Sequence, residues 1–112
     1  MKTPTDKGAA VAEGWTELSS DPEITDDELY MLLFVNLCEG DYQTLIPMGY
    51  VHLRREERAL AYACWSLAAV KGQAEAVPLL AQLARRMSRG EILFAEEDTR
   101  TMLQAMNRKH FH

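Results

Sequence analysis

The clearest pattern of apolar and polar positions in the chain lies between residues 59 and 87. Its first half places apolar residues on one helical face, at the spacing i, i+3, i+4, i+7: Ala61, Cys64, Trp65 and Ala68. Gly72 follows, where a glycine can end the helix in a left-handed cap. The second half starts near Ala74 or Glu75 and continues the apolar stripe: Val77, Leu80, Ala81 and Ala84, widened by Leu83 and Met87. The stretch therefore predicts a helix, a turn and a second helix.

Two capping boxes predict where two further helices begin. The first box starts at Thr25 and precedes an apolar run, so we expect a helix that extends to Glu39 and stops at Gly40. The second box starts at Ser88 and opens a final helix with one apolar face: Ile92, Ala95, Thr99, Met102 and Met106. Residues 29–35 are apolar all round their helix. We expect other helices or a second copy to cover that helix on more than one side.

Weaker patterns complete the expected organisation. A short helix with Pro47 near its start is predicted over residues 44–53, and residues 54–57 form a polar link. After a loose tail of residues 1–7, the spacing of Val11, Trp15 and Leu18 predicts a helix over residues 8–19, with Trp15 docked on the body.

No run of Val, Ile and Thr alternates as a strand would, so we expect one all-α domain over residues 8–112, with about five helices. We expect Gly72 to be a close helix contact or a cap. The expected core comprises Trp65, Leu67, Ala68, Leu80, Leu83, Ile92 and Met102.

Residues spread over positions 45–106 stand at joint spacings that belong to a known repeat: Met48-Gly49, the run 61–69, Gly72, Ala76 and the run 83–87. Together they resemble the Sel-one-like repeat, a relative of the tetratricopeptide repeat. The resemblance implies a superhelix fragment of antiparallel helical hairpins that scaffolds other proteins and has no catalytic residues. The residues 52–55 depart from the family's G-x-G-V turn. Because the chain has room for one repeat and a flanking pair, we expect atypical capping helices, self-association or stabilisation by a partner.

Charge is distributed unevenly along the 112 residues, which carry a net charge of −5. Residues 1–53 hold two basic and ten acidic side chains, a net −8, whereas residues 54–112 hold ten basic and seven acidic ones, a net +3. An acidic front half disfavours nucleic acid and anionic membranes, because both select Lys and Arg. It suits a protein partner with a basic patch.

Cys38 and Cys64 lie in apolar helical patterns, so we expect free, buried thiols in a reducing cytoplasm. Residues 1–12 have no apolar signal-peptide core, and the apolar run of residues 29–35 is too short to span a membrane.

The chain offers few groups that could perform chemistry. The histidines are His52, His110 and His112, and the terminal pair has no Cys or carboxylate framework beside it, so no metal or cofactor is expected. No phosphate-binding loop or nucleophile motif is present, which argues against an enzyme. Arginines near residues 54–58 and 85–89 do not lie on a polar recognition helix, which argues against a DNA-binding regulator.

These observations favour a non-catalytic protein–protein interaction module, used as an adaptor or as an inhibitor, immunity or chaperone-type binder. The alternative is a structural scaffold that associates with itself. We expect a partner to meet the concave helix face and the acidic N-terminal region. The candidate partner-binding residues are Asp26, Asp27, Glu28, Tyr30, Phe34, Tyr50, Arg54 and Arg58.

Overall fold

The computed structural model describes the backbone of residues 20–110 and the side chains of residues 20–107. Every regular element in this part of the chain is helical, as predicted. The elements are α3 (Asp26–Cys38), the 3-10 turn η1 (Tyr42–Thr44), α4 (Leu45–Arg54), α5 (Arg58–Val70), α6 (Ala76–Ala84) and α7 (Arg89–His110). The helix predicted over residues 8–19, with Trp15, and the tail of residues 1–7 lie outside the described residues.

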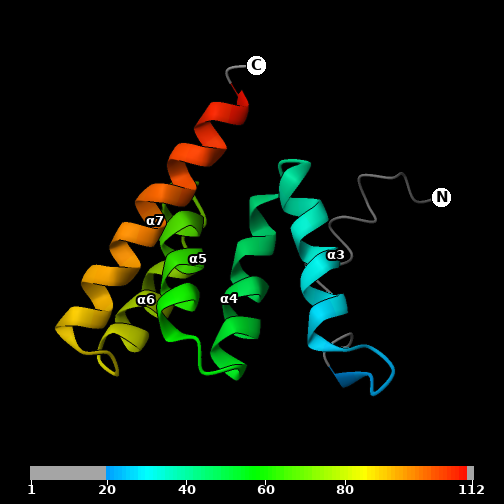
Figure 1. Ribbon diagram of the computed structural model, residues 1–112, viewed down its shortest axis with the longest axis horizontal. Coiled ribbons are helices and arrows are strands. Elements are labelled where there is room, and N and C mark those ends of the chain that lie inside the picture. Colours follow the sequence, from blue (N-terminus) through cyan, green and yellow to red (C-terminus); the bar gives the residue numbers. More distant parts are fainter. Residues whose placement is uncertain (1–19, 111–112) are drawn as a thin grey trace.

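The helices form a flat stack (Figure 1). Helices α3, α4 and α5 lie side by side and run in alternating directions, and α7 packs on the far side of α5. The shortest extent of the molecule is 23 Å, about two helix diameters. Among the helices of residues 20–110, α3 lies at one edge of this stack, and its described contacts with other elements are to α4 and η1.

Local sequence signals define where the helices begin. Thr25 accepts a hydrogen bond from the backbone N–H of Glu28 at 3.1 Å, and the Glu28 carboxylate accepts one from the backbone of Thr25. Ser88 and Glu91 make the same reciprocal pair at the start of α7. Both predicted capping boxes are confirmed, because each needs only residues within one turn.

Three helices end in the same way. After α3, α4 and α5 the chain adopts a positive φ at Gly40 (97°), Glu56 (61°) and Gly72 (91°), positions that are equally spaced along the sequence. The two N–H groups that follow each helix bond back to its last carbonyls, as from Gly72 to Ala69 and from Gln73 to Ala68, which is the Schellman motif. Gly72 is therefore a left-handed cap and an exposed residue, so of its two expected roles the cap is confirmed.

The densest packing lies between α4 and α5. Trp65 is 2% exposed, and its indole Nε1–H donates to the carbonyl of Ile46 at 2.9 Å. A Cβ atom at Gly49 would lie 2.2 Å from Trp65 Nε1, so only glycine lets the indole cross α4 at this point. Ala61 and Ala68 are fully buried on the same face of α5. The predicted core is confirmed here.

Farther along the chain the predicted core is confirmed only in part. Leu67 and Leu83 are buried, whereas Leu80, Ile92 and Met102 are partly buried against the core. The predicted stripe of α6 is wrong at Val77, which is 58% exposed, and at Ala81, which is exposed, but its widening residues Leu83 and Met87 are buried, as is Ala76. Helix α6 is short and apolar on most sides, so its packing on α5, and not its own pattern, selects the buried face.

One expectation about α3 needs correction, and another, its cover on more than one side, stays a prediction because residues 1–19 and a second copy are not described. Within the described part of the chain, α3 is covered on one side, where Leu29, Leu33 and Asn36 are buried. Cys38 is exposed, and only Cys64 is a buried thiol. Cys38 is exposed because, among residues 20–110, the helix neighbours of α3 lie on its other side (Figure 1).

Candidate functional site

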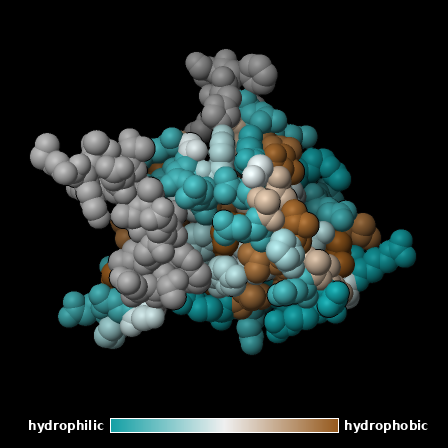
Figure 2. Space-filling model, turned by 180° about the vertical axis from the view of Figure 1, so that it is seen from behind, coloured by the Kyte–Doolittle hydropathy of each residue, from teal (hydrophilic) through white to brown (hydrophobic). Residues whose placement is uncertain are grey.

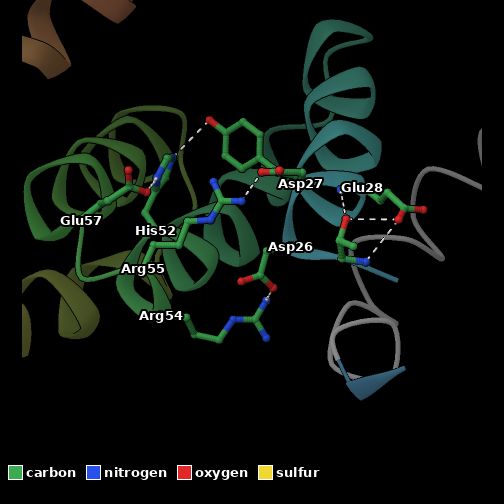
Figure 3. Close-up of polar contacts among 9 residues, drawn as sticks. Asp26, Asp27, Glu28, His52, Arg54, Arg55 and Glu57 are labelled. Atoms are coloured by element: carbon green, nitrogen blue, oxygen red, sulfur yellow. Dashed lines mark hydrogen bonds and ion pairs between the residues drawn. The ribbon is translucent and has the colours of Figure 1, made fainter. Parts of the chain in front are cut away.

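Ion pairs join the start of α3 to the end of α4 (Figure 3). Arg54 donates to Asp26 at 2.5 Å, and Arg55 donates to Asp27. The hydrogen bond to Asp27 raises the pKa of Arg55. All four side chains are at least one-third exposed, so solvent screens these pairs and they orient the two helices more than they stabilise them.

A buried histidine makes a second polar link between α3 and α4 (Figure 3). His52 is 7% exposed, and its Nδ1 lies 3.1 Å from a carboxylate oxygen of Glu57, while Nε2 lies 3.2 Å from the hydroxyl of Tyr30. A carboxylate only accepts hydrogen bonds, so Nδ1 carries a proton. The Tyr30 ring also meets the His52 ring edge-on, with centroids 5.0 Å apart. The contact thus joins α3, α4 and the N-cap of α5.

The order carboxylate, imidazole, hydroxyl is that of a nucleophilic triad, so the state of the hydroxyl matters. Burial raises the pKa of Tyr30 to about 12, with smaller contributions from Cys64 and Glu57. A raised pKa keeps the phenol protonated, whereas an activated nucleophile needs its proton removed. The contacts of Tyr30 with His52 are better suited to holding α3 against α4.

The opposite side of α3 exposes four large apolar residues, which we call the outer face: Met31 (59% exposed), Leu32 (44%), Phe34 (44%) and Val35 (51%). A shallow, open groove of about 500 Å³ runs along this side. Its walls are formed by Ile24, Asp27, Glu28, Met31, Leu32 and Val35. A cluster of large apolar side chains on one exposed helix is uncommon on a monomer and is typical of a surface that binds something.

Apolar exposure elsewhere is more scattered. Seen from behind, hydrophobic side chains emerge among hydrophilic ones over the middle of the molecule (Figure 2). The other large apolar residues that are exposed lie on three helices: Leu60 and Val70 on α5, Val77 on α6, and Leu93 and Phe94 on α7. None of these helices exposes as many as α3 does within the described residues.

The structure brings together six of the eight candidate partner-binding residues. Asp26, Asp27, Tyr30 and Arg54 lie in the contact between α3 and α4, Glu28 lies in the groove, and Phe34 lies on the outer face. The other two lie apart.

Tyr50 meets the Trp65 ring edge-on at 5.1 Å between centroids. Arg58 donates to the carbonyl of Arg86 at 2.7 Å and pairs with Glu91 at 3.4 Å. Both side chains help to hold helices together.

Sequence reasoning missed all four apolar groove residues: Ile24 before α3, and three residues on α3, Met31, Leu32 and Val35. The three on α3 occur in the apolar run of residues 29–35, where every position looked equally suited to burial. One signal was available: Asp27 precedes Met31 by one helical turn and Glu28 precedes Leu32 by one, so two acidic residues share a side with these apolar ones.

The described side chains contain no group of three or more His, Cys, Asp or Glu residues placed to hold a metal ion, and the side chains of His110 and His112 lie outside them. In the same part of the chain, no helix combines the length and the apolar character that crossing a membrane requires. Comparisons with protein-family models, with curated proteins and with solved structures find no match for this chain.

Proposed function

We propose that this chain is a non-catalytic, cytoplasmic module that binds another protein, and that the outer face of α3 is the surface it uses. The observation that carries the proposal is the exposure of Met31, Leu32, Phe34 and Val35 on one helix, beside a groove. Burying such side chains against a partner is favourable by about 25 cal/mol per Å² of apolar surface. An adaptor and an inhibitor, immunity or chaperone-type binder would both use such a face.

The polar contacts on the inner side of α3 support this role. The ion pairs of Asp26 and Asp27 with α4, and the hydrogen bond of Tyr30 to His52, fix the rotation of α3 about its axis. A helix whose rotation is fixed presents the same residues to a partner each time, so less entropy is lost on binding. The hydrogen bond of Tyr30 to His52 therefore helps to keep Met31 on the exposed side of α3.

The repeat-like organisation supports the same proposal. Helices α3, α4 and α5 alternate in direction (Figure 1). The residues with positive φ that follow them, Gly40, Glu56 and Gly72, are equally spaced along the sequence. We propose that the chain is a short relative of the Sel-one-like repeats. In such stacks the outer side of a terminal helix must be polar or must be covered by another protein surface. The outer face of α3 is apolar, so a partner protein takes the place of the next repeat.

Affinity capture from cells of the source organism, followed by mass spectrometry, tests the proposal. The bait is the full chain, alongside a variant in which Met31 and Val35 are both changed to Ser. The matched control changes Leu93 and Phe94 to Ser, because these α7 residues are exposed to a similar degree, 59% and 65%. We expect a protein that the parent and the α7 variant retain and that the α3 variant loses.

Two results would contradict the proposal. One is a set of captured proteins that is the same for all three baits, which would remove the outer face of α3 as a binding surface. The other is a chain that elutes as a dimer and becomes a monomer in the Met31 and Val35 variant. That result would support the self-associating scaffold.

A further inference from the structure

We propose that the groove on α3 accepts an amphipathic helix of a partner protein, and that this helix carries Lys or Arg beside its apolar ridge. The inference rests on the proposed function and specifies the chemistry of the partner. Two independent features of the groove carry it, the spacing of its walls and the sign of its charge.

The walls of the groove have the spacing that helix packing uses. On α3, Asp27, Met31 and Val35 follow one another at i, i+4, i+8, and Glu28 and Leu32 form the neighbouring row, beside which Ile24 lies just before the helix. Side chains at i±4 form the ridges of a helix surface, and the groove between two such ridges receives the ridge of a second helix. The shape of this groove therefore favours a helix over an extended strand, which would need an open sheet edge.

The groove is apolar along its length and acidic at one end. Met31, Leu32 and Val35 line the part toward the C-terminus of α3, and Asp27 and Glu28 face solvent at its N-terminal end. The Asp27 side chain is 82% exposed even though it pairs with Arg55. A cation on a partner helix would reach both carboxylates from solvent.

Arg55 pairs with Asp27 at this surface but leaves the Asp27 side chain largely exposed. Residues 20–53, which include all of α3 and η1, contain seven acidic residues and no Lys or Arg. A second copy that docked its own α3 on this groove would bring no Lys or Arg from residues 20–53 to meet Asp27 and Glu28, and in a parallel arrangement it would place like charges together, which opposes binding. A basic amphipathic helix meets both requirements, because its apolar face fills the groove and its cations meet the acidic end.

Synthetic helices provide the probe. One peptide of about 18 residues places leucine on one face and lysine on the other, and a second replaces every lysine with glutamate. A third has the composition of the first in a scrambled order without an apolar face. Fluorescence anisotropy of labelled peptides against the full chain gives each affinity. We expect the lysine helix to bind at least about tenfold more tightly than the glutamate helix, with a gap that narrows as salt rises, because ions screen exposed charges.

Protein variants separate the apolar contribution from the charged one. Met31→Ser with Val35→Ser should weaken the lysine helix about tenfold or more, and Leu93→Ser with Phe94→Ser should leave its affinity within about twofold, because the latter pair lies on α7. Asp27→Asn with Glu28→Gln should reduce the preference for lysine over glutamate about fivefold, since glutamine can still complete the capping box at Thr25. Circular dichroism and a thermal melt check that each variant folds.

Several outcomes would overturn the inference. Equal binding of the lysine and glutamate helices, equal binding of the scrambled peptide, or equal loss in the α3 and α7 variants would each do so. Tighter binding by Trp15→Ser would show that the chain's own N-terminal segment competes for the groove. The lysine and glutamate helices could bind equally while a captured protein still depends on Met31 and Val35. In that case the proposed function stands, and only the inferred chemistry of the partner is wrong.

Discussion

The contact between α4 and α5 and the outer face of α3 use apolar residues in opposite ways. In the first, Trp65 is 2% exposed and fits against Gly49 so closely that a single added carbon would collide with it. In the second, Met31 and Val35 are more than half exposed at the edge of the same stack. The apolar content of the two regions is similar, so apolar content alone does not mark a core. The difference lies in the neighbours: α4 packs against Trp65, whereas among residues 20–110 the helix contacts of α3 are on its other side.

The largest expected effect is in the core. Trp65→Ala removes the indole and its hydrogen bond to Ile46, and we expect the free energy of unfolding to fall by about 3–5 kcal/mol. Urea denaturation followed by circular dichroism measures this change. Trp65→Phe keeps a ring but loses the hydrogen bond, and should cost less. A loss below about 1 kcal/mol for Trp65→Ala would show that this contact does not anchor the stack.

Gly49→Ala tests the same contact from the other helix. Alanine normally stabilises a helix relative to glycine by about 1 kcal/mol, but here its methyl group would overlap the indole, so we expect a loss of about 2 kcal/mol or more. The matched control is Gly90→Ala on α7, where the nearest atom to a new Cβ is Ser88 Oγ at 4.0 Å. In the Trp65→Ala background the cost of Gly49→Ala should largely disappear. A cost that persists there would contradict the proposed clash.

Thr25→Ala probes the edge helix. Loss of the capping hydrogen bond to the N–H of Glu28 should lower the free energy of unfolding by about 1 kcal/mol. Because the described neighbours of α3 lie on one side, we expect its amides to exchange with solvent faster in the variant, while those of α5 change little. Hydrogen exchange read by mass spectrometry distinguishes the two helices. Equal acceleration in both would mean that α3 and α5 unfold only together.

Glu56→Gly is expected to stabilise the link between α4 and α5. Glu56 has a φ of 61°, a left-handed geometry that disfavours residues with a Cβ atom, so glycine should raise the free energy of unfolding by about 0.5–1 kcal/mol. Gly72→Ala, at the corresponding end of α5, should have the opposite sign. If both substitutions act in the same direction, backbone geometry is not the cause.

The two thiols contrast the exposed helix α3 with the buried side of α5 most directly, and testing them perturbs stability least. Cys38 is exposed on α3, whereas Cys64 is buried and burial raises its pKa to about 12. At pH 8 a thiol-specific disulfide reagent should therefore modify Cys38 in the folded protein and Cys64 only after unfolding, because the thiolate is the reactive form. The raised pKa adds stability below the pKa of an unfolded thiol, and this stability is lost as the pH rises toward 12. Rapid modification of both thiols in the folded state would contradict the described packing.

The sequence by itself determined the helix boundaries and much of the core. The caps at Thr25 and Ser88 and the stop at Gly72 depend on hydrogen bonds between residues a few positions apart, so a local pattern is sufficient to predict them. The inward face of α5 was also predictable, because small residues and one tryptophan occupy a single side of that helix. The left-handed residue at Glu56 was not, since glutamate carries no signal for that geometry.

Only the tertiary structure decided which side of α3 and of α6 faces outward. Both helices are apolar on most sides, so many rotations bury similar amounts of apolar surface and the pattern cannot choose among them. The choice comes from residues distant in sequence, such as Arg54 and Arg55, which pair with the first turn of α3, and His52, which bonds to Tyr30. The acidic residues were visible in the sequence. Their position at the end of an exposed apolar groove followed only from the rotation of α3.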